Sequence, residues 1–258
     1  MLRKLIFFLL LGYVFGYNNT FGLYNVRLSA IAYCPEETVE NWSCYWCQYF
    51  PNAKVITTLW DSKTSTYAYI VYDLEQDNYI LSFEGTQDTN DFLIDLQIAK
   101  LTPYKEHPTA KVHSGFWNAY LSIRNEILNI VEFAPRLFIT GQSLGGALST
   151  LASLDILEEY PNLDIYTVTF GSPRVGNLDY VYLYSSIVEN SYRVTHGKDP
   201  VVHLPPEFLG FVHVPFEIYY PNNTMNYIFC STNNCAEKEY GINLEDHSIY
   251  LDIRVPKC

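Results

Sequence analysis

Ser143 stands between two glycines in the stretch Gly141-Gln142-Ser143-Leu144-Gly145, a spacing typical of a nucleophile on a sharp strand-to-helix turn. Such a turn strains the backbone of the serine, and side chains two residues before and after it would collide, so glycine is needed at both places. The amide groups at the start of the following helix point toward a developing oxyanion. The alternative is an ordinary turn with a serine by chance, for which this composition predicts about 0.04 occurrences of the motif. We therefore interpret Ser143 as a candidate nucleophile.

A serine nucleophile needs a histidine base and a carboxylate that orients it, and after this type of turn the acid precedes the histidine in the chain. Asp199 lies in the loop "HGKDP", directly after the predicted strand "YRVTH". His247 lies in "LEDHSIYL", after the last long predicted strand and its loop. We therefore predict a Ser143–His247–Asp199 triad. Other residues fit less well, because they precede the serine, lie within elements or connections, or stand too close to Asp199: His107, His113, His203, His213, Asp155, Asp164 and Asp179.

An oxyanion is stabilised by two backbone N–H groups, one of them from the residue after the nucleophile, which here is Leu144. The second comes from a loop that follows an earlier strand, and "LSFEGTQDT" is a suitable loop. Gly85 allows a close approach there, and Thr86 offers its N–H. Thr86 taken alone is equally compatible with a helix cap, so its assignment depends on Ser143.

The elements that must position these residues alternate along the chain. Tyr-, Ile- and Val-rich runs predict strands, and apolar residues at helical spacing predict helices. We expect strands at 66–73, 78–85, 136–141, 164–171, 192–196 and 211–220, and helices at 114–131 and 145–160. Strands that alternate with helices of this length imply an α/β fold with a mostly parallel sheet and helices on both faces. Functional residues of such sheets lie at the carboxyl ends of the strands, where the candidates above are found.

The composition is typical of a globular protein, and the first residues resemble a targeting segment. Arg3 and Lys4 precede a short apolar run, which predicts a signal peptide over residues 1–16, with an uncleaved anchor as the alternative, and a single domain over 17–258. Cleavage lowers Lys plus Arg from 16 to 14 against 28 Asp plus Glu, a net charge of −14. This balance argues against a nucleic-acid partner and against capture by anionic membranes.

Six cysteines in a secreted chain predict three disulfides, although 15 pairings are possible. The spacing suggests short loops for Cys44–Cys47 and Cys230–Cys235, which leaves Cys34 and Cys258 to join the two ends. Zinc binding by Cys44 and Cys47 is the alternative, but a second ligand pair at suitable spacing is missing from the sequence. Three sequons predict N-glycosylation on surface loops, at Asn18, Asn41 and Asn222.

The chain resembles the secreted fungal-type class 3 lipase family in six stretches that occur in family order: "SFEGT", "VHSGF", "ITGQSLGGAL", "TFGSPRVGN", "YRVTHGKDPVVHLPP" and "EDHSIY". The resemblance implies an α/β-hydrolase fold, the triad and oxyanion residues named above, and the same three disulfides. One position departs from the family, which usually has arginine where this chain has Glu84. That substitution leaves the triad intact, but it implies different salt bridges in the oxyanion loop.

The resemblance further implies a lid over residues 87–104, which in lipases is an amphipathic segment that opens at a lipid surface. Here its apolar residues are interspersed with acidic and amide side chains. The expected function is that of a triacylglycerol lipase, with no cofactor and no metal, acting as a monomer on an ester or lipid substrate, including at a lipid–water interface. The alternatives are a feruloyl or aryl esterase, a phospholipase, and a non-catalytic binding protein on the same fold. The expected location is extracellular, or the lumen of the secretory or endolysosomal pathway.

Overall fold

The computed structural model describes residues 16–87, 98–222, 224–231, 235–236 and 241–258. The predicted signal peptide, apart from Gly16, and most of the predicted lid lie outside the described residues. Within the described part, no helix has the length and the apolar character needed to cross a membrane.

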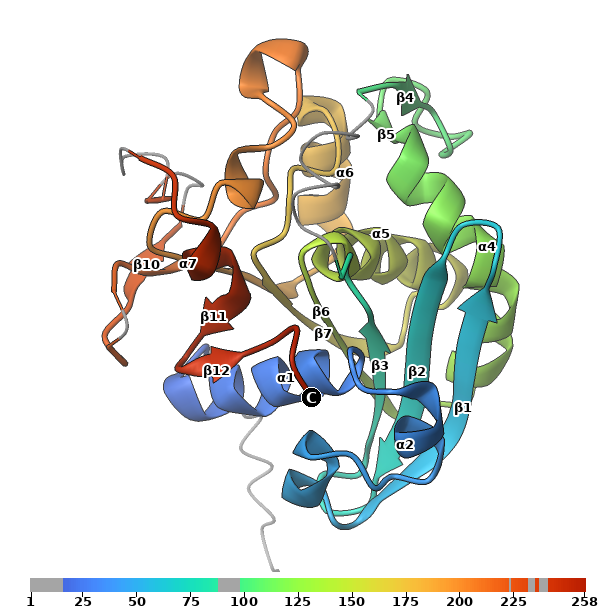
Figure 1. Ribbon diagram of the computed structural model, residues 1–258. Helices are drawn as coiled ribbons and strands as arrows, with labels where there is room; N and C mark the ends of the chain where they lie inside the picture. Colours follow the sequence, from blue (N-terminus) through green and yellow to red (C-terminus); the bar gives the residue numbers. More distant parts are fainter. Residues whose placement is uncertain (1–15, 88–97, 223, 232–234, 237–240) are drawn as a thin grey trace, which may run out of the picture.

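An eight-stranded sheet forms the centre of the molecule, in the order β1-β2-β3-β6-β7-β8-β9-β10. The strands β3, β6, β7, β8 and β9 run parallel to one another, while the pairs β1–β2 and β2–β3 at one edge and β9–β10 at the other are antiparallel (Figure 1). The strands are β1 (Ala53–Asp61), β2 (Thr66–Asp73), β3 (Asn78–Phe83), β6 (Arg136–Gln142), β7 (Asp164–Phe170), β8 (Asn190–His196), β9 (Glu217–Tyr220) and β10 (Ile228–Cys230). Two small pairs lie outside it: β4 (Lys100–Leu101) with β5 (Val112–His113), and β11 (Ile249–Tyr250) with β12 (Ile253–Arg254).

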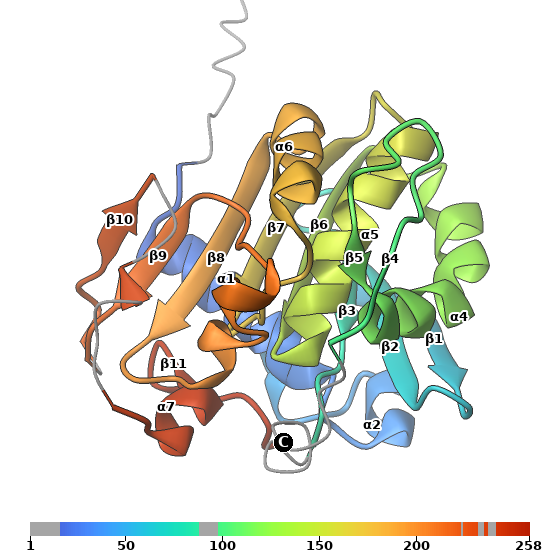
Figure 2. The same cartoon turned by 90° about the horizontal axis from the view of Figure 1, so that it is seen from above.

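Helices cover both faces of this sheet, which confirms the predicted fold class. In Figure 2, α4, α5 and α6 lie over one face of the sheet and α1 lies over the other. The helices are α1 (Asn19–Ile31), α2 (Glu36–Glu40), α4 (Ser114–Val131), α5 (Leu144–Glu159), α6 (Leu178–Ile187) and α7 (Leu244–Ser248), with 3-10 turns η1 (Trp46–Tyr49), η2 (Val201–His203) and η3 (Glu207–Leu209).

Each face of the sheet has its own apolar core, because successive side chains of a strand point to opposite faces. In β3, Leu81 and Phe83 belong to the core under α4 and α5, whereas Ile80 belongs to the core under α1. The same alternation separates Ile139 from Phe138 in β6. Both cores are almost completely buried, and they hold the strand ends at fixed positions relative to one another.

The strand expected over 211–220 is shorter in the structure, which is a correction. Only Glu217–Tyr220 pairs as β9, while Val212 makes an isolated bridge to Gly176. Phe216 has a φ of 64°, and Pro215 before it has no N–H for a sheet hydrogen bond. The pairing of this segment with β8 therefore begins only after the kink, at Glu217.

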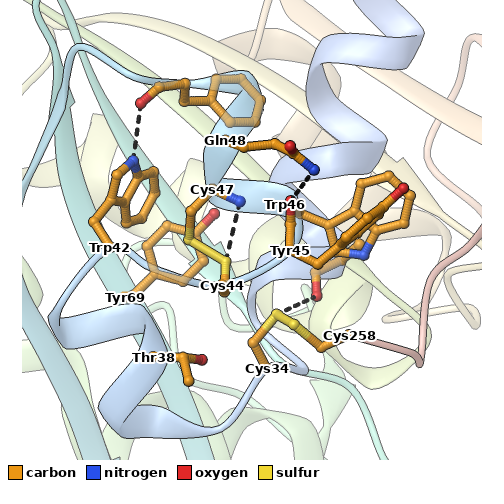
Figure 3. The surroundings of a disulfide bond; sticks show 12 residues. Cys34, Thr38, Trp42, Cys44, Tyr45, Trp46, Cys47, Gln48, Tyr69 and Cys258 are labelled. Carbon is orange, nitrogen blue, oxygen red and sulfur yellow. Dashed lines mark hydrogen bonds between the residues drawn. A yellow bond between two sulfur atoms is a disulfide. The ribbon is translucent and has the colours of Figure 1, made fainter.

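The six cysteines form the disulfides Cys34–Cys258, Cys44–Cys47 and Cys230–Cys235. The first of these ties the last residue to the segment just after α1, and it lies beside the second (Figure 3). In the same region, the indole of Trp46 donates a hydrogen bond of 3.0 Å to the carbonyl of Lys257. The C-terminal segment is therefore fastened to the N-terminal part of the domain.

Candidate active site

Ser143 forms the turn between the central strand β6 and the helix α5. Its backbone is strained, with φ 58° and ψ −127°, a combination that residues other than glycine rarely adopt. Its N–H donates to the carbonyl of Phe170 in the neighbouring strand at 2.8 Å, and its own carbonyl accepts from Gly146 at 2.9 Å. The turn is therefore held by the sheet on one side and by the helix on the other.

The two glycines around Ser143 are required by close backbone contacts, one within this turn and one with the end of β3. A Cβ on Gly141 would lie 2.4 Å from the carbonyl carbon and oxygen of Gly145. A Cβ on Gly145 would lie 2.3 Å from the carbonyl oxygen of Phe83, at the end of β3. These oxygens belong to the backbone and cannot move aside, so both positions need glycine, although the atoms that a side chain would meet belong to Gly145 and Phe83 and not, as expected from the sequence, to Ser143.

Asp199 and His247 meet in the folded chain although 48 residues separate them. The Nδ1 atom of His247 lies 2.8 Å from Oδ2 and 2.9 Å from Oδ1 of Asp199, and both side chains are buried. A carboxylate only accepts hydrogen bonds, so Nδ1 carries the proton and Nε2 is an acceptor. This is the imidazole tautomer that can remove a proton from a hydroxyl group.

Tyr250 gives the carboxylate of Asp199 a further partner. Its hydroxyl donates to Oδ2 at 2.5 Å, and the N–H of Val201 donates to Oδ1 at 2.8 Å. Burial, followed by the nearby charge of Asp199, raises the pKa of Tyr250 well above its usual value, so the hydroxyl remains a donor. The charge of the carboxylate is thus balanced by three hydrogen-bond donors within a buried site.

The loop after β3 lies against the turn of Ser143. A Cβ built on Gly85 would be 3.1 Å from the Cβ of Ser143, which brings the backbone of this loop next to the candidate nucleophile. Thr86 follows Gly85 directly, and Leu144 begins α5 directly after Ser143. The carboxylate of Glu84 accepts a hydrogen bond of 2.8 Å from Gln87, and burial raises its pKa. Where the family usually has arginine, this loop therefore has a carboxylate, which is held by the side-chain amide of Gln87.

Gln142 and Tyr33 also reach this site, and sequence reasoning missed both. The Nε2 atom of Gln142 lies 2.8 Å from the carbonyl oxygen of His247 and 3.1 Å from its Nε2. The hydroxyl of Tyr33 donates to Oε1 of Gln142. Gln142 stands next to the candidate nucleophile in the sequence, and Tyr250 stands three residues after His247, so proximity to a motif was the available signal. Tyr33 carried no comparable signal.

Three of the other histidines make hydrogen-bonding contacts with the backbone. His113 caps α4 by accepting from the N–H of Phe116 at 3.2 Å, His213 lies 2.6 Å from the carbonyl of Val202, and His196 contacts the carbonyl of Asp246 at 3.1 Å. Among the described residues, both groups that could hold a metal ion contain cysteines that are oxidised in disulfides. The sulfurs of Cys44 and Cys47 are bonded to each other and are not zinc thiolates.

Comparison with known proteins places this geometry in a family context. The family described as lipase (class 3) matches residues 80–209. A lipase from Rhizopus niveus is 32% identical over 249 residues, which is 90% of this chain and 63% of that protein, so the chain spans less than two thirds of that relative. The structure of lipase II from Rhizopus niveus aligns with a TM-score of 0.85 at 30% identity, over 91% of this chain and 94% of that one. A triacylglycerol lipase, whose catalytic centre is described as a serine protease triad, aligns with a TM-score of 0.84 at 26% identity, over 92% and 96% of the two chains.

Proposed function

This chain belongs to the class 3 lipase family, and we propose that it is a secreted serine hydrolase that cleaves the ester bonds of triacylglycerols. The observation that carries the proposal is the buried hydrogen bond between Nδ1 of His247 and Asp199, at the same end of the sheet as the strained turn of Ser143. The similar triacylglycerol lipase with a serine protease triad supports the assignment.

In the proposed reaction, Nε2 of His247 removes the proton of the Ser143 hydroxyl while its oxygen attacks the ester carbonyl. Asp199 holds the imidazole by its Nδ1–H and stabilises the imidazolium that forms. The alcohol leaves with the proton from His247, and an acyl-enzyme remains on Ser143. Water then attacks this acyl group with His247 acting again as base, which releases the fatty acid and restores the serine.

The oxyanion of each tetrahedral intermediate is stabilised by the N–H groups of Leu144 and Thr86. The position of Gly85 against Ser143 supports this role, since it brings the backbone of the loop to the reacting carbonyl. Loss of one such donor typically costs about 100-fold to 1,000-fold in kcat. The chemistry needs no metal ion and no organic cofactor.

We further propose that residues 1–16 form a cleaved signal peptide, that residues 17–258 form one hydrolase domain, and that the segment 87–104 acts as a lid at a lipid–water interface. Triacylglycerols are insoluble in water, so an enzyme that hydrolyses them must reach an aggregated substrate. The resemblance to the lipase family supports the lid, while the acidic and amide side chains among the apolar residues of 87–104 make this segment more polar than a lid that contacts lipid.

The test is the Ser143→Ala variant, assayed on tributyrin emulsion and on p-nitrophenyl butyrate. We expect kcat to fall by about 10⁴-fold or more, with an unchanged melting temperature and with loss of labelling by a serine-reactive phosphonate. Substantial activity in this variant would refute the assignment. Rates of the wild type on triolein emulsion, phosphatidylcholine vesicles and methyl ferulate separate a triacylglycerol lipase from a phospholipase and a feruloyl esterase. Absence of phosphonate labelling in the wild type would favour a binding protein.

A further inference from the structure

The hydrogen bonds around Gln142 can be made in only one orientation of its side-chain amide. The carbonyl oxygen of His247 only accepts, so the group that faces it at 2.8 Å is the NH₂ of Gln142. The opposite end of the amide is then Oε1, which accepts from the hydroxyl of Tyr33. Because the amide is planar and buried, these two contacts together fix where its N–H groups point.

The same NH₂ group lies 3.1 Å from Nε2 of His247. Nδ1 of this ring carries the proton, because it faces Asp199, so Nε2 is an acceptor and Gln142 donates to it. Gln142 therefore engages the lone pair of Nε2 and fixes the orientation of the His247 ring.

Tyr33 connects this arrangement to the oxyanion loop. A Cβ on Gly85 would lie 2.2 Å from the Tyr33 hydroxyl and 2.5 Å from the carbonyl oxygen of Gln142, so the hydroxyl is seated directly against the loop backbone. Burial raises the pKa of Tyr33, and a hydrogen bond from the backbone of Gly85 lowers it by less. The hydroxyl thus stays protonated and keeps donating to Gln142.

We propose that Gln142, oriented by Tyr33, is a positioning residue that holds His247 in the resting enzyme with Nε2 ready to accept the Ser143 proton, and that couples this base to the oxyanion loop. The proposal rests on the proposed function. When substrate binds, Nε2 of His247 passes from the Gln142 amide to the hydroxyl of Ser143, while the hydrogen bond from Gln142 to the His247 carbonyl holds the backbone in place.

Several ionisable groups around the imidazole must be considered in any pH experiment. Asp199 faces Nδ1 from the loop after β8, and Tyr250 of β11 approaches the ring through Asp199. Others lie one contact further away, in the turn after α1, the oxyanion loop, β8 and α7: Tyr33, Glu84, His196 and Asp246. They are identical in wild type and Gln142 variants, so a shift between these proteins reports the substitution.

The experiment compares Gln142→Met and Gln142→Glu with wild type on p-nitrophenyl butyrate, with rates expressed per site titrated by a phosphonate. Methionine keeps the length of the side chain but donates no hydrogen bond, so we expect kcat to fall about tenfold with KM unchanged within about twofold. Glutamate places a carboxylate next to Nε2 and favours the protonated ring, so the acid limb of kcat/KM should move to higher pH by about one unit.

Tyr33→Phe tests the connection to the oxyanion loop. We expect kcat to fall about threefold, and the double variant with Gln142→Met to lose little more than Gln142→Met alone, because both changes disrupt one network. The matched control is Tyr69→Phe, which removes another buried tyrosine hydroxyl, one that donates to the carbonyl of Leu28 at 2.7 Å. This control should lower stability without changing kcat per titrated site.

Wild-type kcat in Gln142→Met together with an unmoved acid limb in Gln142→Glu would overturn the inference. An effect of both variants that disappears when rates are expressed per titrated site would overturn it as well, because it would show a role in folding only. The Ser143→Ala variant separates the two proposals. If it is active, the proposed function fails; if it is inactive while the Gln142 variants match wild type, only the role of Gln142 fails.

Discussion

Removing the Cys34–Cys258 disulfide should cost far more stability than removing either of the other two. This bond joins residues 224 positions apart, whereas Cys44–Cys47 and Cys230–Cys235 join residues 3 and 5 positions apart. The entropy that a cross-link removes from the unfolded chain grows with the logarithm of the loop length. At 25 °C this relation gives about 5 kcal/mol for the long loop and about 2 kcal/mol for each short one. A loss of about 5 kcal/mol is comparable to the whole stability of many domains.

The measurement is urea unfolding at 25 °C, followed by tryptophan fluorescence, of the wild type and of the C34S/C258S and C44S/C47S variants. The first variant should also show a larger dependence of the unfolding free energy on urea concentration, because its unfolded chain is free to expand. Activity should fall in the same variant, since the fastened C-terminal segment carries His247 and Tyr250. Equal losses of stability in the two variants, within about 1 kcal/mol, would refute the reasoning from loop length.

Three further predictions concern backbone strain, the acid of the triad and pH. Ser143→Gly should be about 1 kcal/mol more stable than Ser143→Ala in urea unfolding, because only glycine tolerates φ 58° without strain; equal stabilities would contradict this. Gly171→Ala should lower kcat about tenfold or more at unchanged KM in an esterase assay. Gly171 has a φ of +56°, and a Cβ there would lie 2.5 Å from the Tyr250 hydroxyl oxygen and 2.8 Å from Oδ2 of Asp199, so it would displace the acid of the triad. An unchanged kcat would contradict this prediction. Burial lowers the pKa of His213 well below 6.5, so this residue is neutral when folded and takes up a proton on unfolding in acid. The contribution of His213 to the free energy of unfolding should therefore be constant above about pH 6.5 and fall below it by up to about 1.4 kcal/mol per pH unit, so the His213→Gln variant should lose less stability in acid than the wild type, and equal slopes would contradict this.

The sequence pattern predicted correctly those helices and strands whose hydrophobic residues match the surfaces that are buried in the fold. The helix predicted over 114–131 and the strand predicted over 66–73 have the same limits in the structure, because an apolar face determines the helix and a run of aromatic and β-branched residues, buried on both faces of the sheet, determines the strand. The strand expected over 211–220 was wrong at its beginning, where the positive φ of Phe216 interrupts the pairing. A single kink of this kind leaves the overall hydrophobic pattern unchanged, so the pattern did not reveal it.

In the candidate site too, some features could be predicted from the sequence and others could not. The glycines around Ser143 are local steric requirements, and they could be inferred from spacing. The contacts of Gln142 with His247 and with Tyr33 join residues 105 and 109 positions apart, so they depend on how α1 and the C-terminal segment pack against the end of β6. Such contacts between distant segments follow from the tertiary structure, and the sequence around each residue contains no trace of them.

The position of His247 along the chain also has a consequence for biosynthesis. Gln142 and the turn beside it precede His247 by 105 residues, and Asp199 precedes it by 48. At about 5 to 20 residues per second, a ribosome needs about 5 to 20 s to extend the chain from the turn to the histidine. The central strands can associate during this interval, while the nascent chain still has no base to activate its serine. The ester-cleaving activity that we propose would therefore arise only after His247 has been synthesised, when nearly all of the proposed domain over residues 17–258 is already in place.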